Sequence, residues 1–254
     1  MPDHNEDGPA RLNKSALQFR GFFPFDEFND IQTRAFPIAY ESDENIILSA
    51  PTGSGKTVVM ELCALRFAER GPRNFSGNWG LAKGGSQYKI IYLAPSRSLI
   101  SERLRCWKES FSKVGVSVTE LQGTQSLETC AASINDSDIL LSTPEKWDSL
   151  YRRFSTGSSA SWQVGLLLID EIHFLGEKGR GAALEAVICR MKNMSSSSTQ
   201  PLRIVACSAT LANPHDIGYF LGCHSSCVLE FGPEFRPVPL DVQVSLCAAI
   251  NRLV

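Results

Sequence analysis

The segment over residues 45–65 constrains the fold of this chain more than any other. It opens with an apolar run at 45–49 and closes with an apolar stretch at 58–65 that is typical of a helix. Between the two lies the glycine-rich turn Ala50-Pro51-Thr52-Gly53-Ser54-Gly55-Lys56-Thr57. A strand, a glycine-rich turn and a helix in this order form the context of a phosphate-binding loop. A chance glycine turn is the alternative, but the complete Gly-Lys-Thr ending with these flanks favours a nucleotide site.

The residues of this loop have separate expected roles in holding a nucleotide. Gly53 and Gly55 let the backbone bend so that successive N–H groups point at phosphate oxygens, and the N-terminus of the helix adds a favourable dipole. Lys56 is predicted to reach the β- and γ-phosphates, and the hydroxyl of Thr57 is predicted to ligate Mg²⁺. ATP and Mg²⁺ are therefore the expected cofactors.

A pair of acids follows a second apolar run. Residues 164–169 lead directly into Asp170-Glu171-Ile172-His173, which predicts a fully buried parallel strand with carboxylates at its C-terminal tip. Ligands bind at that tip in open α/β sheets. Asp170 is predicted to hold the Mg²⁺, directly or through water, and Glu171 to orient and deprotonate the attacking water. A strand that simply ends in acids is common, but its coupling to the phosphate loop favours phosphoryl transfer.

The bulk properties limit the classes of protein that the chain can represent. Its 254 residues suffice for one large α/β domain or two small ones, and a hydrophobic content of 43% with 20% charged residues is ordinary for a globular protein. A net charge of −2 argues against a broad basic surface, so a nucleic acid would be gripped by local groups. The longest apolar run, near 166–169, is too short to span a bilayer, and the N-terminus lacks the regions of a signal peptide. We expect no membrane partner and an intracellular protein.

The eight cysteines raise the question of a metal site. Three of them lie inside apolar patterns and are predicted to be buried: Cys63, Cys189 and Cys207. Cys223 and Cys227 lie near two histidines, His215 and His224, which would suit zinc. Because no second pair of cysteines at a usual spacing completes a four-ligand set, the sequence favours reduced thiols over a metal site.

The remaining pattern alternates strands with helices. Buried strands are predicted at 89–95, 114–121, 138–142, 164–169, 202–207 and 227–231, and helices at 98–111, 181–194 and 216–221. Residues 1–18 are predicted to be disordered, the segments around 71–86, 155–161 and 195–201 to be surface loops, and the aromatic cluster at 19–28 to be core packing. Alternation of this kind predicts a doubly wound α/β fold with a mainly parallel central sheet.

Gln32 precedes the phosphate loop by a short distance. Its side-chain amide carries both a donor and an acceptor, which matches the edge of adenine. A solvent-exposed glutamine on a helix is the alternative, and the residue alone leaves both open.

Five segments follow one another at domain-scale spacing and resemble motifs I, Ia, Ib, II and III of superfamily 2 helicases of the DExH type. They are residues 50–57, Ala-Pro-Ser-Arg at 94–97, Thr-Pro-Glu-Lys at 143–146, Asp-Glu-Ile-His at 170–173 and Ser-Ala-Thr at 208–210. Phe-Asn-x-Ile-Gln-x-x-Ala-Phe-Pro at 28–37 and Phe-Arg-Pro-Val-Pro-Leu at 235–240 resemble the Ski-like branch. The segments 142–148 and 180–191 are most similar to the meiotic crossover DNA helicases. The resemblance covers residues 19 to about 245.

The resemblance implies a three-layer, RecA-like fold of the P-loop NTPase type and further site residues. Gln32 would read adenine beside the ATP-binding loop at 50–57. A second set would couple the state of the phosphates to movement between two RecA-like lobes: His173, Ser208, Ala209 and Thr210. A third set would lie along the phosphate backbone of a single strand: Pro95, Ser96, Arg97, Thr143 and Pro144. Ser96 and Thr124 depart from the family pattern, and both departures concern strand contacts.

The resemblance also implies a division of the chain. Residues 19–240 would be the first RecA-like lobe, and residues 241–254 would begin the connection to a second lobe, in cis or in trans, that carries motifs IV to VI. Without an arginine finger from that lobe, hydrolysis would lose roughly 10³–10⁵ in rate. The expected whole is a nuclear, ATP-dependent 3′-to-5′ helicase acting on single-stranded or branched DNA in meiotic recombination. A Ski-like or spliceosomal RNA helicase lobe, and a truncated non-catalytic nucleotide- and nucleic-acid-binding module, remain alternatives.

Overall fold

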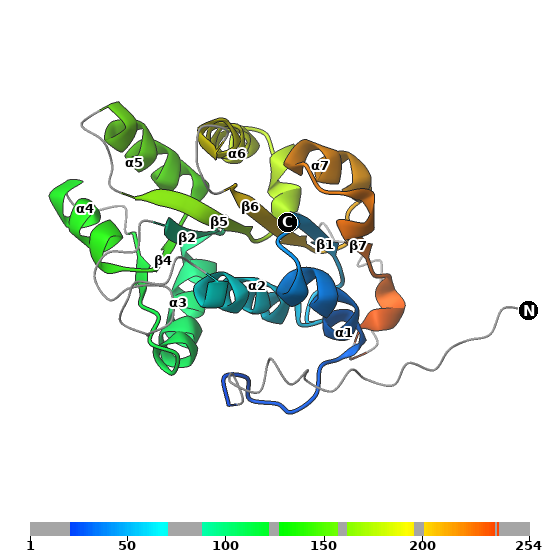
Figure 1. Cartoon of the computed structure of the whole chain (residues 1–254). Coiled ribbons are helices and arrows are strands. Elements are labelled where there is room, and N and C mark those ends of the chain that lie inside the picture. The colour runs from blue at the N-terminus through cyan, green and yellow to red at the C-terminus, as the bar shows by residue number, and fades with distance from the viewer. Residues whose placement is uncertain are drawn as a thin grey trace, which may run out of the picture.

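A parallel sheet forms the middle layer of the protein (Figure 1). The computed structural model describes residues 21–70, 88–121, 127–156, 162–195, 201–236 and 238. Within these residues the strands are β1 (Ile46–Ser49), β2 (Tyr88–Leu93), β3 (Val118–Glu120), β4 (Ile139–Ser142), β5 (Gln163–Ile169), β6 (Arg203–Ser208) and β7 (Val228–Glu230). Their spatial order is β3-β4-β2-β5-β6-β1-β7, and every recorded pairing is parallel. The predicted parallel α/β sheet is confirmed.

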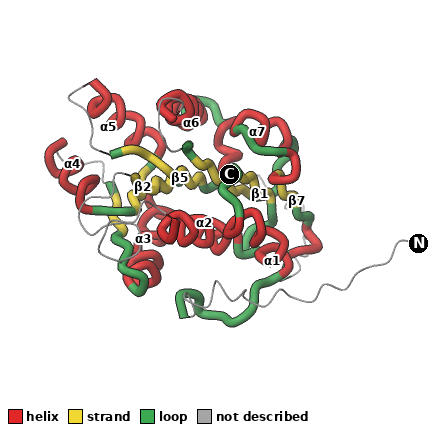
Figure 2. Tube along the Cα trace, viewed as in Figure 1, coloured by secondary structure: helices red, strands yellow, loops and turns green. Residues whose placement is uncertain are grey.

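Helices cover both faces of this sheet, which gives three layers (Figure 2). They are α1 (Asp30–Phe36), α2 (Lys56–Arg70), α3 (Arg97–Ser112), α4 (Leu127–Asp136), α5 (Pro144–Thr156), α6 (Gly181–Ser195) and α7 (Pro214–Leu221), with short turns η2 (Pro37–Glu41), η3 (Ile172–Gly176), η4 (Ser225–Cys227) and η5 (Pro233–Phe235). The first three helices share one buried cluster with one face of the sheet, and α4 to α7 share a second cluster with the other face.

The central strands are mostly apolar because both of their faces are covered. The four residues of β1 and the last five of β5 are all buried. Gly165 in β5 has a specific packing role, since a Cβ there would lie 2.3 Å from the ring of Phe67 on α2. The absence of a side chain therefore lets α2 approach the sheet closely.

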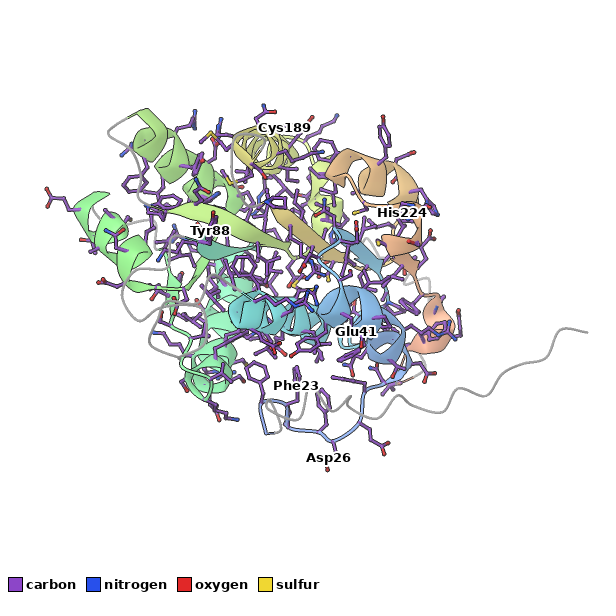
Figure 3. The ribbon with its side chains drawn as sticks, viewed as in Figure 1. Phe23, Asp26, Glu41, Tyr88, Cys189 and His224 are labelled. Atoms are coloured by element: carbon purple, nitrogen blue, oxygen red, sulfur yellow. The ribbon has the colours of Figure 1, made fainter. Side chains whose placement is uncertain are left out.

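The aromatic cluster predicted to be core packing does line the interior. Phe22, Phe23 and Phe28 are buried, and the ring of Phe22 meets that of Phe111 on α3 edge to face at 5.0 Å. Figure 3 shows Phe23 on the side of this segment that faces the helices and Asp26 on its outer side. The segment thereby fastens α1 against α2 and α3.

Two sequence predictions differ from the structure in ways that local geometry explains. The strand expected at 114–121 is reduced to Val118–Glu120, because α3 runs to Ser112 and a turn with Gly115 at φ +74° follows it. Cys63 and Cys207 are buried as predicted, but Cys189 is exposed. The buried stripe of α6 instead runs through neighbouring positions such as Ile188, and Cys189 lies on the outer side of the helix (Figure 3).

Helices α4 and α5 are among those not expected from the sequence. α4 lies at 127–136, and α5 begins where the resemblance marks only a strand-binding motif. The sequence does carry a start signal for α5, since Pro144 stands at the first helical position and the hydroxyl of Thr143 accepts from the N–H of Lys146 at 3.3 Å.

Several predictions concern parts of the chain outside the described residues. They are the disordered tail at 1–18, the loop around 71–86, Thr124, most of the loops at 155–161 and 195–201, and the connection at 241–254. Among the residues that the structure does describe, no helix is long and apolar enough to cross a membrane.

Candidate functional site

The predicted site residues meet at one edge of the sheet, where the parallel strands end. The glycine-rich loop follows β1, Asp170 and Glu171 follow β5, and β6 lies between these two strands. The N–H of Ala50 donates to the carbonyl of Ser208 at 3.2 Å, which joins the loop to the end of β6. The strand order therefore brings residues 50–57, 170–173 and 208–210 together although they are far apart in sequence.

The loop has the backbone that its glycines were expected to allow. Gly53 and Gly55 adopt φ values of +81° and +86°, which other residues rarely take. The ammonium of Lys56 donates to the carbonyls of Ala50 at 2.8 Å and Pro51 at 2.9 Å. An ammonium has three donors, so one donor of Lys56 remains for a ligand while the other two hold the loop in shape.

Gln32 and Asn29 hold this loop from the side. Each donates its backbone N–H to the other's side-chain oxygen, at 2.9 and 3.0 Å, which forms a capping box at the start of α1. The side-chain amides then donate to the loop, from Asn29 to the carbonyl of Ser54 at 3.0 Å and from Gln32 to that of Gly55 at 3.4 Å. Gln32 is 5% exposed, so the solvent-exposed alternative is wrong.

Gly55 is required for a second reason beside its positive φ. A Cβ at this position would lie 2.3 Å from the amide nitrogen of Gln32. The amide of Gln32 keeps one unused N–H and one unused lone pair in this arrangement, so its contact with the loop and a contact with a base are compatible.

Asp170 is held by hydrogen bonds to both of its oxygens. The hydroxyl of Tyr92 on β2 donates to Oδ2 at 2.7 Å, and the backbone N–H of Glu171 donates to Oδ1 at 3.1 Å. Glu171 itself has φ 56° and ψ 50°, the one left-handed conformation of a non-glycine residue among those described. Such a conformation costs on the order of 1–3 kcal/mol and persists where the surroundings impose it, often at functional sites.

The side chain of Glu171 faces His173 and Ser208. His173 Nδ1 lies 2.9 Å from the hydroxyl of Ser208 and 3.2 Å from Glu171 Oε2. Although Oε2 of Glu171 is buried and close to the imidazole, it has no hydrogen bond of good geometry within the described structure. A carboxylate oxygen that is not engaged in a hydrogen bond of good geometry is suited to accept a proton from a bound water.

The end of β6 carries the remaining residues of this set. Ser208 is fully buried, Ala209 is half-buried and its carbonyl accepts from the hydroxyl of Ser49 at 3.5 Å, and Thr210 is exposed. The structure therefore brings His173 and Ser208 into direct contact, while Thr210 faces solvent.

A polar cluster that the sequence analysis did not find lies beneath Asp170, between the sheet and two helices. Burial, followed by the charge of Asp170, raises the pKa of Tyr92 well above its usual value, so its hydroxyl keeps the proton that it donates. Burial acts to lower the pKa of Arg103 on α3, but Tyr92, Asp170 and Glu61 on α2 offset it and the pKa is raised. The indole N–H of Trp107 donates to Glu61 at 2.7 Å. The sequence carries one signal for this cluster, because Glu61 and Arg103 are charged residues within apolar helical faces.

Glu61 should give the free energy of unfolding a specific pH dependence. Burial raises its pKa from 4.5 to about 7, against the opposing effects of the Trp107 hydrogen bond and the Arg103 charge. Between these two values the folded chain keeps a proton that the unfolded chain has lost, so this contribution to stability is present at the acid end and falls as the pH rises to about 7. The free energy of unfolding of the wild-type chain should therefore fall by roughly 2–3 kcal/mol across this window. We expect Glu61→Gln not to show this fall.

Urea unfolding at pH 5 and pH 8 measures this difference. The exposed Glu102 on α3 provides the matched control, because Glu102→Gln removes a carboxylate from the same layer without a buried contact. Equal pH dependence in the wild-type chain and in Glu61→Gln would contradict the prediction.

The two loops expected to contact a single strand of nucleic acid are partly closed to solvent. Pro95 and Pro144 are buried, so a strand would have to meet these loops through their neighbours Ser96, Arg97 and Thr143. The hydroxyl of Ser96 accepts from the N–H of Leu99 at 3.4 Å and thereby caps α3, as Thr143 caps α5. Each loop therefore presents the N-terminus of a helix, which suits phosphate groups.

An open hollow of about 380 Å³ lies beside α1. Its lining residues are Asn29, Asp30, Ile31, Glu234, Phe235 and Arg236. The guanidinium of Arg34 lies over the ring of Phe235, 5.1 Å from its centre. The hollow adjoins the capping box that contains Gln32.

The residues considered for zinc do not assemble in the described part of the chain. There, no group of three or more His, Cys, Asp or Glu side chains gathers closely enough to hold a metal ion. One of the two histidines, His215, lies 3.2 Å from Glu230 and forms an ion pair with it when protonated.

The sequence of this chain is similar to those of known helicases. A family model described as DEAD/DEAH box helicase matches residues 29–217. The chain is 42% identical over 235 residues to the ATP-dependent DNA helicase homolog MER3 of Arabidopsis thaliana, a match that covers 89% of this chain and 20% of that protein. It is 37% identical over 221 residues to the DExH-box ATP-dependent RNA helicase DExH13 of the same plant, which covers 87% of this chain and 9% of that protein. The chain thus spans a fifth or less of the length of these relatives.

The fold is similar to a solved structure of Mss116p bound to ssRNA and AMP-PNP. The TM-score is 0.67 at 18% sequence identity, over 91% of this chain and 46% of that one. At this identity the likeness concerns the fold, and it confirms the predicted RecA-like architecture.

Proposed function

The chain belongs to the DEAD/DEAH box helicase family, and from that premise we propose that it is the first, ATP-binding motor lobe of a nucleic-acid helicase. One observation carries the proposal: the loop after β1 and the acids after β5 lie at one edge of the sheet with one strand between them. Phosphoryl transfer requires this pairing, because phosphates, metal ion and attacking water must meet in one place.

The phosphates of ATP would be held by the glycine-rich loop. The free donor of Lys56 and the backbone N–H groups at 53–57 suit the β- and γ-phosphates. The hydroxyl of Thr57 and the carboxylate of Asp170 are oxygen donors of the kind that Mg²⁺ prefers, and Tyr92 fixes the orientation of the carboxylate. Thr57 and Asp170 would thus hold a metal ion whose charge offsets part of that of the phosphates.

The base of the nucleotide would lie beside α1. Gln32 retains a donor and an acceptor for the edge of adenine while its other hydrogen bonds hold the loop. The hollow that opens next to it is lined by Phe235 and Arg236, whose aromatic ring and guanidinium are groups of the kind that stack on a base.

Hydrolysis would depend on Glu171 as the general base. Its buried Oε2 is available to accept a proton from the attacking water, and its backbone N–H donates to the carboxylate of Asp170. His173 joins this base to Ser208 at the end of β6. We propose that His173 and residues 208–210 transmit the state of the phosphates to movement of a second RecA-like lobe.

A second lobe, in cis or in trans, is part of this proposal. Residues 19–240 would form the first lobe and residues 241–254 the start of its connection. Where arginine fingers have been studied, their loss costs roughly 10³–10⁵ in rate. We therefore propose that this chain by itself binds Mg-ATP and hydrolyses it weakly.

We propose single-stranded or branched DNA as the nucleic acid, and a nuclear 3′-to-5′ DNA helicase of meiotic recombination as the whole protein. The 42% identity to a DNA helicase homolog and the resemblance of residues 142–148 and 180–191 to the meiotic group support this choice. An RNA helicase is the second candidate, because an RNA helicase is 37% identical to the chain. Intact Lys56, Asp170 and Glu171 argue against a non-catalytic binding module.

Fluorescence anisotropy with labelled single strands of DNA and RNA of one sequence tests the choice. In the presence of Mg²⁺ and a non-hydrolysable ATP analogue, we expect saturable binding of DNA that is at least as tight as that of RNA. Arg97→Gln should weaken binding of the strand and lower the slope of log affinity against log salt by about 0.7, the effect of one lost phosphate contact.

Arg105→Gln is the matched control, since Arg105 is an exposed arginine two turns further along the same helix. Tenfold tighter binding of RNA would favour the RNA helicase. No saturable binding of either strand would contradict the role in nucleic-acid binding.

A further inference from the structure

The segment Gly179-Arg180-Gly181 follows η3 and ends on the first residue of α6, and none of its residues has been given a role in the site above. The guanidinium of Arg180 contacts three separate elements there. It donates to the carbonyl of Pro95 in the loop after β2, and its Nε lies 3.7 Å from a carboxylate oxygen of Glu145 in the first turn of α5. It also lies over the ring of Phe174 in η3, 5.3 Å from the ring centre. Both loops that face the proposed strand are therefore joined to the segment that follows the catalytic acids.

The backbone around Arg180 is fitted to this position. Gly179 has φ +87°, a conformation that favours glycine. A Cβ on Gly181 would lie 2.3 Å from the carbonyl oxygen of Leu175 and 2.8 Å from that of Phe174. Gly181 therefore allows α6 to begin directly against η3, and a larger residue would move the start of the helix and Arg180 with it.

The chemistry of the contacts requires an arginine. A planar guanidinium has five donors in a fixed fork, so it can bond a carbonyl, pair with a carboxylate and stack on a ring at once. Arg180 and Glu145 are both about half exposed, so their ion pair alone would contribute little. Pro95, Pro144, Asp170 and Arg180 also line one small hollow, so the arginine lies near the acid that would hold the metal ion.

We infer that Arg180 is a positioning residue that couples strand binding to nucleotide binding, by fixing the loops at 95–97 and 143–145 to the segment that carries Asp170 and Glu171. The inference rests on the proposed function, because it takes these loops as the strand-binding surface. Coupling of this kind is reciprocal: the strand tightens nucleotide binding by the factor by which the nucleotide tightens strand binding. Without Arg180 the loops are no longer attached to the segment that carries Asp170 and Glu171, and the coupling factor falls towards one.

Two measurements on the 254-residue chain test the inference. The first is amide hydrogen exchange of the segments 95–99 and 143–147, which reports the loops without any ligand. The second is the affinity for a fluorescent Mg-ATP analogue with and without a saturating oligothymidine strand, which gives the coupling factor. The variants are Arg180→Ala, Arg180→Lys and Gly181→Ala. The control is Arg152→Ala, which removes an exposed arginine that pairs with Asp148 on the same helix at 2.8 Å.

We expect Arg180→Ala to speed exchange of both loops at least fivefold and to reduce the coupling factor at least threefold, with affinity for the nucleotide alone unchanged. Gly181→Ala should act in the same direction, Arg180→Lys should retain part of the coupling, and Arg152→Ala should match the wild-type chain. Unchanged exchange and an unchanged coupling factor in Arg180→Ala, beside a wild-type chain that binds the strand, would overturn this inference alone. A wild-type chain that binds nucleotide but no strand would overturn the proposed function.

Discussion

Replacement of Lys56 with alanine is expected to weaken the binding of Mg-ATP by roughly 10- to 100-fold, since a hydrogen bond to a charged group contributes about 1.5–3 kcal/mol. In the proposed site, the ammonium is the one side-chain cation that the loop itself would offer to the phosphates. It also holds the loop, through the carbonyls of Ala50 at 2.8 Å and Pro51 at 2.9 Å. Both effects act in the same direction, because a loosened loop would also present its N–H groups less well.

Equilibrium titration with a fluorescent ATP analogue in excess Mg²⁺ measures this loss. Lys108→Ala is the control, because Lys108 is an exposed lysine on α3 at a distance from the loop. The thermal midpoint of Lys56→Ala should stay close to that of the wild-type chain, so that lost binding is not lost folding. Equal affinities in Lys56→Ala and in the wild-type chain would contradict the assignment of the loop.

Replacement of Trp107 with alanine is expected to lower the free energy of unfolding by roughly 3–5 kcal/mol. Trp107 is fully buried, and its ring meets those of Tyr92 at 5.0 Å and Phe111 at 5.4 Å. Its indole N–H is also the hydrogen-bond donor to Glu61, whose carboxylate would be left in the interior without it. A domain is usually stable by about 5–15 kcal/mol, so the loss would be a large part of the free energy of unfolding.

Urea unfolding followed by circular dichroism measures the change. Trp107→Phe separates the two causes, because a phenyl ring preserves most of the packing but cannot donate to Glu61. We expect it to cost about 1–2 kcal/mol, the penalty for one unsatisfied buried group. A loss below about 1 kcal/mol in Trp107→Ala would show that α3 does not depend on this ring.

The parts of the fold that were predicted well depend on local pattern. The strand predicted at 164–169 is observed as Gln163–Ile169, and the glycine-rich loop adopts the positive φ values at Gly53 and Gly55 that its sequence implies. Continuous apolar runs and glycine turns are specified within a few residues, so they can be read without knowledge of their neighbours. The meeting of the loop with Asp170 follows in turn, because the carboxyl ends of parallel strands share an edge.

The parts that were missed depend on contacts between distant residues. Tyr92 lies 78 positions from Asp170 along the chain, and in the sequence it is one apolar position of a buried strand. Arg180 is separated from Pro95 by 85 positions, and nothing near it in sequence indicates that it contacts that loop. Contact of Gln32 with adenine stays a prediction, while its hydrogen bonds to Asn29 and Gly55 could be found only from the fold.

The boundaries of short elements were uncertain for a related reason. Alternation of apolar and polar residues at 114–121 suggested one strand, but the first part serves as the turn after α3, with Val116 N–H donating to the carbonyl of Phe111 at 3.0 Å. In α6 an apolar composition concealed which side faces the sheet, and Cys189 fell on the other one.

The most direct test of the central claim is calorimetric titration of the wild-type chain with ATP, first in excess Mg²⁺ and then in EDTA. If β1, β5 and β6 together form a Mg-nucleotide site, one molecule of ATP should bind per chain, and removal of the metal ion should weaken binding strongly. Asp170→Asn should lose most of this dependence on Mg²⁺, since it removes the carboxylate opposite the loop. Absence of saturable binding, or binding that is indifferent to both Mg²⁺ and Lys56→Ala, would contradict the account.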